Sequence, residues 1–230
     1  MFILLSHFLG VDTPAFAGGP SLTISPIKEI GKGGSSNSYT LTFPNHLGTH
    51  IDAPLHFDPL GKPLSAYDLE DLVFTRPVLL DIPKEDSELI RKDDLQAERE
   101  PISKADLLLL RTGFEQFRET DPVRYSTRNP GLSAEAAAYI SQKLPGLRGI
   151  VLDTISASAV QHREEGRRAH TTLLSSRNFF IIEDAALSRY PGGVERILAF
   201  PLFVVGVDSA PCTLVAEAHS SRLAGHIQRR

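Results

Sequence analysis

The chain has no tryptophan, one methionine and one cysteine, Cys212, among its 230 residues. A lone cysteine excludes an intrachain disulfide and fits a reducing compartment, so we expect a cytoplasmic protein. No apolar run is long enough to span a bilayer. The apolar start, residues 1–9, lacks a basic flank and predicts a first strand rather than a signal peptide.

The sequence also lacks an excess of either charge. It has 24 Lys and Arg against 28 Asp and Glu, a net charge of -4. This balance offers no basic surface for nucleic acid or for an anionic membrane, so we expect neither as a partner. Hydrophobic residues make up 41% of the chain, which is typical of a soluble globular protein, and we expect a single domain over residues 1–230.

Several catalytic motifs are missing. There is no Gly-x-Ser-x-Gly elbow. The segment Gly34-Ser35-Ser36 is no substitute, because it lies in a glycine-rich turn with no helix signal after it. There is no phosphate-binding loop and no dinucleotide-binding glycine fingerprint. Cys212 follows Pro211 and is either a nucleophile or, more simply, a small buried residue.

The most informative segment is the histidine-rich stretch over residues 45–56. Its candidate metal ligands are His46, His50, Asp52 and His56. All four are at even positions, which share one face of an extended backbone, and Gly48 and Pro54 disfavour one continuous helix. Imidazole and carboxylate together suit zinc, manganese or iron(II). The alternative is a turn-rich loop with hydrogen-bonded histidines, but three histidines and an aspartate in phase favour a metal.

Hydrophobic patterning predicts a mixed α/β fold. Strands are expected near 1–5, 21–29, 39–43, 78–82, 107–110, 149–153, 179–182, 200–207 and 213–216. Tyr39, Leu41 and Phe43 alternate as in a half-buried strand, whereas 107–110 is apolar throughout, as in a strand covered on both faces. Helices are expected near 65–72, within 87–98 and over 134–143, the last capped by Ser133. Strands dominate the first half and alternate with helices in the second, which indicates a layered α/β domain.

Two residues far from the histidine-rich segment could complete a metal site. His170 precedes the apolar pair Leu173-Leu174, and Glu183 ends an apolar strand. They are either ligands, or a helix-starting histidine and a surface glutamate. Asp153, Thr154 and Ser156 follow a buried strand, where open α/β folds place ligands.

Four further histidines carry weaker signals. His7 either lines the pocket or is a hydrogen-bonded core residue, and His162 lies among charges and is expected to be solvated. His219 and His226 are in a polar tail, and no role is assigned to them.

The histidine-rich segment resembles the signature of a known family. The pattern His46-x-Gly48-Thr49-His50-x-Asp52-x-Pro54-x-His56 resembles the signature of the cyclase family of metal-dependent hydrolases, which includes bacterial kynurenine formamidase and isatin hydrolase. Similar segments extend over nearly the whole chain, at residues 5–7, 111–113, 153–156, 170–183, 201–202 and 209–211. The resemblance implies a mixed layered α/β domain of the swivelling β/β/α type, assembled as dimers or larger homo-oligomers.

The resemblance also implies roles for the site residues. His46, His50 and Asp52 would bind a first metal ion, with Asp52 bridging to a second, and His170 and Glu183 would complete that second site or surround it. His56 would be the catalytic acid/base. The cofactor would be one or two ions of zinc or manganese, and the substrate a small molecule.

The implied reaction is hydrolysis of a carbon–nitrogen bond in a small amide, such as an arylformamide of the N-formylkynurenine kind or a cyclic amide. Phe16, Phe57 or Phe114 could wall the substrate pocket. One alternative is a lactam or lactone hydrolase with a single manganese ion, to which His170 and Glu183 are not ligands. The other is a non-catalytic ligand-binding protein with a structural metal.

Three departures from the family pattern bear on the substrate. The first loop reads Phe16-Ala17-Gly18, whereas the formamidases of the family usually have an aromatic residue, often tryptophan, followed by Pro-Gly. Ser158 replaces an aspartate after the Asp-Thr-x-Ser loop, and Cys212-Thr213 stand where an arginine is usual.

Overall fold

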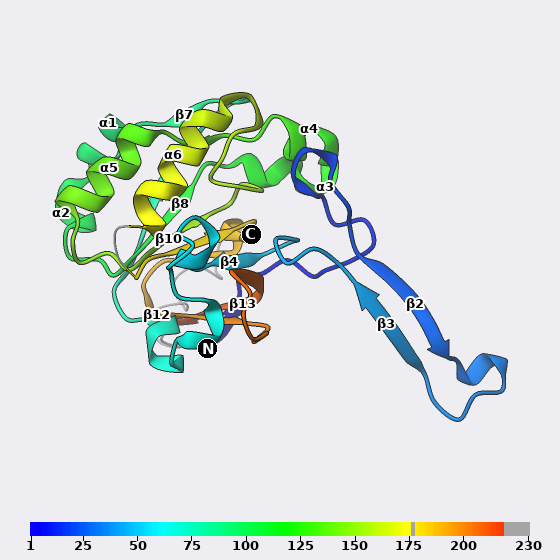
Figure 1. Cartoon of the computed structure of the whole chain (residues 1–230). Helices are drawn as coiled ribbons and strands as arrows, with labels where there is room; N and C mark the ends of the chain where they lie inside the picture. The colour runs from blue at the N-terminus through cyan, green and yellow to red at the C-terminus, as the bar shows by residue number, and fades with distance from the viewer. Residues whose placement is uncertain (176–177, 219–230) are drawn as a thin grey trace, which may run out of the picture.

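The computed structural model describes residues 1–175 and 178–218, and nine strands of this part form one mixed sheet (Figure 1). Their spatial order is β5 (Val73–Phe74), β12 (Val194–Pro201), β13 (Ser209–Ala218), β4 (His50–Asp52), β11 (Phe180–Glu183), β10 (Gly149–Leu152), β8 (Leu107–Arg111) and β6 (Pro77–Asp81), with β1 (Phe2–Leu4) also paired to β13. Strands β6, β8, β10 and β11 are parallel, and the other pairings are antiparallel. Strand β4 therefore joins a parallel half of the sheet to an antiparallel half.

The parallel strands are buried on both faces, as the apolar runs predict. In β8, Leu108 and Leu110 pack toward the helices, whereas Leu107 and Leu109 pack into a second core on the other face. Both faces of a central parallel strand are removed from water in this way, so the strand needs no polar alternation.

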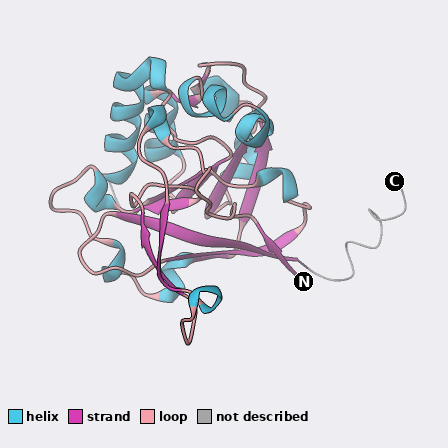
Figure 2. Ribbon diagram, turned by 90° about the vertical axis from the view of Figure 1, so that its right-hand side faces the viewer, coloured by secondary structure: helices cyan, strands magenta, loops and turns pink. Residues whose placement is uncertain are grey.

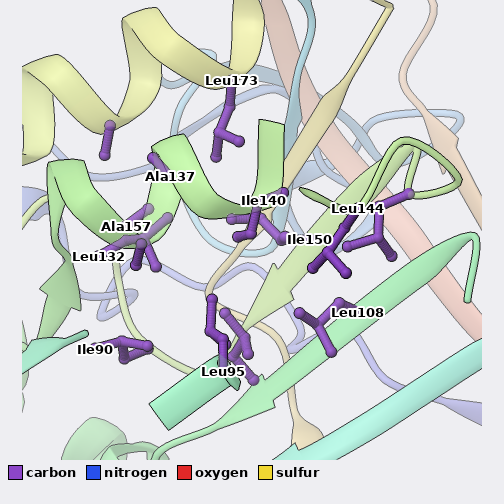
Figure 3. Close-up of a cluster of buried hydrophobic side chains, with 14 of the residues drawn as sticks. Ile90, Leu95, Leu108, Leu132, Ala137, Ile140, Leu144, Ile150, Ala157 and Leu173 are labelled. Carbon is purple, nitrogen blue, oxygen red and sulfur yellow. The ribbon is translucent and has the colours of Figure 1, made fainter. Parts of the chain in front are cut away.

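Helices α5 (Ala134–Lys143) and α6 (Arg163–Leu174) cover the first face of the sheet (Figure 1). Figure 3 shows Ala137 and Ile140 of α5 and Leu173 of α6 meeting Leu108 and Ile150 of the sheet. The predicted cap of α5 is confirmed, because the Ser133 hydroxyl accepts a hydrogen bond from the Ala136 amide at 3.1 Å. Shorter helices are α1 (Lys92–Gln96), α2 (Arg99–Ile102), α3 (Phe117–Thr120) and α4 (Pro122–Thr127).

The second core lies between the two halves of the sheet. It joins Val151 and Ile182 of the parallel half to Ile197 and Leu214 of the antiparallel half. Strand β12 also contacts β6, so the sheet curls until it nearly closes (Figures 1 and 2). The predicted mixed α/β fold of the swivelling type is confirmed.

A two-stranded hairpin projects from this body (Figure 1). It consists of β2 (Thr23–Lys28) and β3 (Ser38–Thr42), paired antiparallel. We refer to residues 23–42 as the arm. The strand expected at 39–43 is present. Its predicted half-burial is wrong for the single chain, because the side chains of Tyr39 and Leu41 are 50% and 56% exposed.

Some predicted elements have different boundaries. The apolar run over 200–207 is not a strand: β12 ends at Pro201, and Leu202 to Val205 lie exposed in a loop. Residues 65–72 form two short 3-10 turns, η4 (Leu64–Ala66) and η5 (Leu69–Leu72), rather than one helix. The remaining short elements are η1 (Phe16–Gly18), η2 (Ile30–Lys32), η3 (Pro54–His56), β7 (Leu89–Ile90), η6 (Phe114–Gln116), β9 (Gly131–Leu132), η7 (Val160–His162) and η8 (Leu187–Arg189). Across the described residues, no helix is long and apolar enough to cross a membrane.

Candidate metal centre

Strand β4 places two of the candidate ligands. His50 and Asp52 lie on one face of the strand, and Ile51 points into the second core. On one side β4 pairs with β11, so that His50 is opposite Glu183. On the other side it pairs with β13, so that Asp52 is opposite Ser209. Three strands distant in sequence thus bring polar side chains to one place in a buried sheet.

His46 and His56 reach the same place through turns rather than through the strand. The chain turns at Gly48, whose φ of 68° and close contact with Leu9 leave no room for a side chain. His56 is the last residue of η3. The expectation of one extended face is therefore right for His50 and Asp52 and wrong for the other two, which converge on the site by backbone turns.

The four side chains and Glu183 form one compact cluster. His46 Nδ1 is 3.1 Å from Asp52 Oδ1, and His50 Nε2 is 3.6 Å from the same oxygen. His50 Nε2 is also 3.2 Å from Glu183 Oε2. Two sets of possible ligands share Asp52, one with His46 and His56 and one with His50 and Glu183; within each set the ligand atoms lie within 4.8 Å of one another.

Buried atoms in this cluster have no hydrogen-bond partner. These atoms are His50 Nε2 and both carboxylate oxygens of Asp52. Burying a polar atom without a partner costs free energy, so such atoms in a tight group of imidazole and carboxylate indicate a cation-binding site. The residues present therefore fit a divalent metal.

Two of the histidines are oriented as metal ligands usually are. The hydrogen-bond geometry assigns the proton to Nδ1 in His50 and in His170, where it is donated to the carbonyls of Gly48 and Gly166, each at 2.8 Å. This arrangement fixes the ring orientation and points Nε2 of both rings at the Glu183 carboxylate, where a cation could bind between them.

The carboxylates favour positive charge at the centre. Burial opposes a charge on His46, but the hydrogen bond with Asp208 and the nearby Asp52 carboxylate outweigh it and raise its pKa to about 10. Burial likewise opposes a charge on His50, whereas Asp52 and Glu183 raise its pKa. Burial alone would raise the pKa of Glu183, but His170 and His50 hold it well below its usual range.

The two distant candidates also reach the cluster. His170 lies within α6 and is buried, with Nε2 at 3.3 Å from Glu183 Oε1, so the reading as a helix-starting histidine is wrong. Glu183 is 3% exposed, so the reading as a surface glutamate is also wrong. Its Oε1 accepts hydrogen bonds from the Ala157 amide at 2.6 Å and the Ser156 hydroxyl at 3.2 Å.

Asp208 is a site residue that the sequence patterns did not single out. Its Oδ2 is 2.7 Å from His56 Nδ1 and 3.0 Å from His46 Nε2. Its Oδ1 accepts a hydrogen bond from Asn45 Nδ2 at 2.8 Å. The only sequence signal is its position just before the segment 209–211, and the antiparallel pairing of β13 with β4 carries it to the site.

A cavity of about 430 Å³ opens onto the cluster. Its lining includes the predicted wall residues Phe16 and Phe57, and Phe57 stacks on the His170 ring with centroids 4.9 Å apart. Ser158, one of the departures from the family pattern, also lines it. Phe114 does not, because it is buried against Phe117 and Tyr125.

Other candidate residues lie elsewhere. His7 and Asp153 line a separate cavity of about 360 Å³. Cys212 is buried, and burial raises the pKa of its thiol, which disfavours a nucleophile. His162 is exposed, as expected, and His219 and His226 lie outside the described residues.

The chain is similar in sequence to two kynurenine formamidases. The chain is 32% identical to the kynurenine formamidase of Bacillus cereus (strain ATCC 14579) over 204 residues, which are 89% of this chain and 88% of that enzyme. It is 30% identical to the kynurenine formamidase of Bacillus anthracis, over 93% of this chain and 96% of that enzyme.

Solved structures agree in fold. Isatin hydrolase A from Labrenzia aggregata superposes with a TM-score of 0.81 at 21% identity, over 95% of this chain and 93% of that one. A potential metal-dependent hydrolase with cyclase activity superposes with a TM-score of 0.74 at 26% identity, over 94% of this chain and 96% of that one. The Cyclase family model matches residues 3–159. This chain therefore belongs to the cyclase family of metal-dependent hydrolases.

Proposed function

We propose that the protein hydrolyses a carbon–nitrogen bond in a small amide, with an arylformamide as the first candidate substrate. The observation that carries the proposal is the group of unpartnered buried atoms, His50 Nε2 and the Asp52 carboxylate, beneath an aromatic-walled cavity. Unsatisfied ligands below an accessible hollow suit a catalytic metal rather than a closed structural one. The similarity to kynurenine formamidases supports this choice of substrate class.

The ligands that would hold the metal are His46, His50, Asp52, His170 and Glu183. The shared position of Asp52 in both ligand sets supports a bridging role and room for two ions. Zinc and manganese both suit this donor set. A bound divalent metal supplies an activated water nucleophile and polarises the substrate carbonyl.

We assign the proton transfer to His56. Its Nδ1 is hydrogen-bonded to the Asp208 carboxylate, which orients the ring and leaves Nε2 for proton exchange. His56 lines the cavity, so this nitrogen can act on the nucleophile and then on the leaving nitrogen. His56 could also bind a metal ion together with His46 and Asp52. Mutation of His56 distinguishes the role of ligand from the role of acid/base.

A second candidate is hydrolysis of a lactam or lactone with a single manganese ion. The fold similarity to isatin hydrolase supports it. The two candidates differ in substrate and in metal content, because the single-ion enzyme would not use His170 and Glu183 as ligands.

A hydrolysis screen tests the proposal. The protein would be loaded separately with zinc and with manganese and assayed on N-formylkynurenine, formanilide, isatin and a simple lactone. We expect turnover of the formamides that is abolished by a chelator and restored by the metal. Turnover of isatin alone would favour the second candidate, and no turnover of any compound would contradict both.

We also propose that the protein is one domain that assembles with copies of itself. The arm supports this, because Ile24 pairs with Leu41 and Pro26 with Tyr39, which places apolar side chains on one face. The other face carries Thr23, Ser25, Thr40 and Thr42. A hairpin with one apolar face and exposed side chains needs another surface to cover it.

A further inference from the structure

Helix α6 runs from exposed residues at its start to the buried His170 at the metal centre. His170 lies at the centre, and Arg167 and Arg163 precede it by three and seven residues, on the same face of the helix. A rise of 1.5 Å per residue puts their Cα atoms about 4.5 Å and about 10.5 Å further along the axis. Both arginines line the same cavity as His170 and Phe57.

Within the described ranges, no carboxylate lies at ion-pair distance from Arg163 or Arg167, and neither side chain makes a hydrogen bond. Other arginines do have acidic partners: Arg168, the next residue on α6, lies 3.7 Å from Glu165, and Arg118 forms a buried pair with Asp184. Glu164 shares a neighbouring surface hollow with Arg167 but forms no ion pair with it.

Among the described residues that line the cavity, no carboxylate pairs with either arginine. The carboxylate in its lining is Glu183, which lies at the base against His50 and His170. Other residues that line the cavity are the apolar Phe16, Phe57 and Ile155. The cavity lining thus combines two exposed arginines, apolar side chains and the metal-binding cluster.

We propose that Arg163 and Arg167 form a subsite for an anionic group, specifically a carboxylate, on the part of the substrate remote from the cleaved bond. The inference rests on the proposed hydrolase function and narrows its substrate to an aryl amide with an acidic side chain. Guanidinium groups match the two oxygens of a carboxylate and are the usual residues for this recognition. A neutral cyclic amide would gain no binding affinity from the two arginines.

Both arginines are exposed, so each contributes modestly. Exposed ion pairs are worth roughly 0.2–1 kcal/mol, which corresponds to about a 1.5- to 5-fold effect per arginine. This contribution should fall as ionic strength rises, because salt screens exposed charges.

A matched pair of substrates tests the subsite. One is a formanilide with a propanoate side chain, and the other is the same compound as its primary carboxamide, which is neutral and similar in size. For the acid, we expect R163A/R167A to raise KM by about 2- to 25-fold with little change in kcat. For the amide, KM should not change. R168A is the control, because Arg168 lies outside the cavity lining, and R163K/R167K should retain part of the effect.

Equilibrium binding separates this inference from the proposed function. Calorimetry with 3-phenylpropanoate and 3-phenylpropanamide on the metal-loaded protein needs no turnover. Tighter binding of the acid, lost in R163A/R167A and kept in R168A, supports the subsite even if no formanilide is hydrolysed. Equal binding of acid and amide to the wild type overturns the subsite, even if both formanilides are hydrolysed.

Discussion

At the scale of single residues, the fold treats two of its buried histidines in opposite ways. His170 faces Glu183, which raises its pKa against the effect of burial. His7 has a side chain that is 6% exposed and lies 3.7 Å from Glu115. Burial lowers the pKa of His7 to about 4, with Asp184 opposing this and Arg118 and Arg189 adding to it. The surroundings of His170 therefore favour the protonated imidazole ring, whereas the surroundings of His7 favour the neutral ring.

His7 should make stability depend on pH. Its folded-state pKa of about 4 lies below the ordinary histidine value of 6.5, so the unfolded chain binds the proton first as pH falls. The stability that neutral His7 provides is complete above pH 6.5 and is lost toward pH 4, by at most about 3 kcal/mol. In urea unfolding at pH 7.5 and pH 4.5, the wild type should lose more free energy of unfolding than H7Q. Equal losses in the two proteins would show that His7 does not titrate in this way.

The sequence predicted most of the site at this scale. Four side chains within eleven residues indicated a metal, and the family pattern added His170 and Glu183. Asp208 could not be predicted, because no local pattern reveals that β13 pairs with β4 so as to bring its carboxylate to His46 and His56. Arg163 and Arg167 could not be predicted either, because α6 was not among the helices expected from the sequence.

At the scale of elements, α6 depends on one glycine. A Cβ at Gly166 would lie 2.0 Å from the Ser158 hydroxyl oxygen and 2.7 Å from the Ser158 Cα. Because one of these contacts is with the backbone, rotation of the serine cannot relieve the clash. The glycine therefore lets the loop with Ser158 pack against the helix and form part of the cavity lining.

Replacement of this glycine should destabilise the protein. Gly to Ala usually favours a helix by up to about 1 kcal/mol, but overpacking costs about 1–3 kcal/mol, so we expect G166A to lower the unfolding free energy. G31A is the control, since no heavy atom lies within 4 Å of a Cβ at that position. Thermal melts of both variants test this, and a G166A that is more stable than the wild type would refute the packing argument.

The elements themselves were predicted with uneven success. Residues 107–110 and 149–152 are apolar runs flanked by polar residues, and both are parallel strands buried on two faces. The same kind of run misled at 202–205, where the apolar side chains lie exposed in a loop. Hydrophobicity predicts that a segment will be covered, but it does not say whether the cover comes from this chain or from another molecule.

At the scale of the whole molecule, the arm is the feature that one chain does not explain (Figure 1). Ile24 and Leu41 form a cross-strand pair, 44% and 56% exposed. Threonines 23, 40 and 42 occupy the opposite face. A second copy that covers this face would account for the half-buried pattern of side chains that are exposed in the single chain.

We expect the wild type to be a dimer or larger by sedimentation velocity at micromolar concentration. L41K, which places a charge on the apolar face, should shift the protein toward the monomer. T40K places the same charge on the hydroxyl face and should leave the assembly intact. A monomeric wild type, or equal effects of the two variants, would refute the proposed role of the arm.

We infer that the cluster around His50 and Asp52 binds the metal, and that His56 transfers a proton during hydrolysis. The direct measurement is metal content by elemental analysis together with hydrolysis rate, for the wild type, H50A, D52A and H56A. We predict that H50A and D52A lose both metal and activity, and that H56A keeps the metal and loses at least about 100-fold in rate, as removal of a general acid/base usually does. An H56A that keeps full turnover, or an H50A that keeps its metal, would contradict the account.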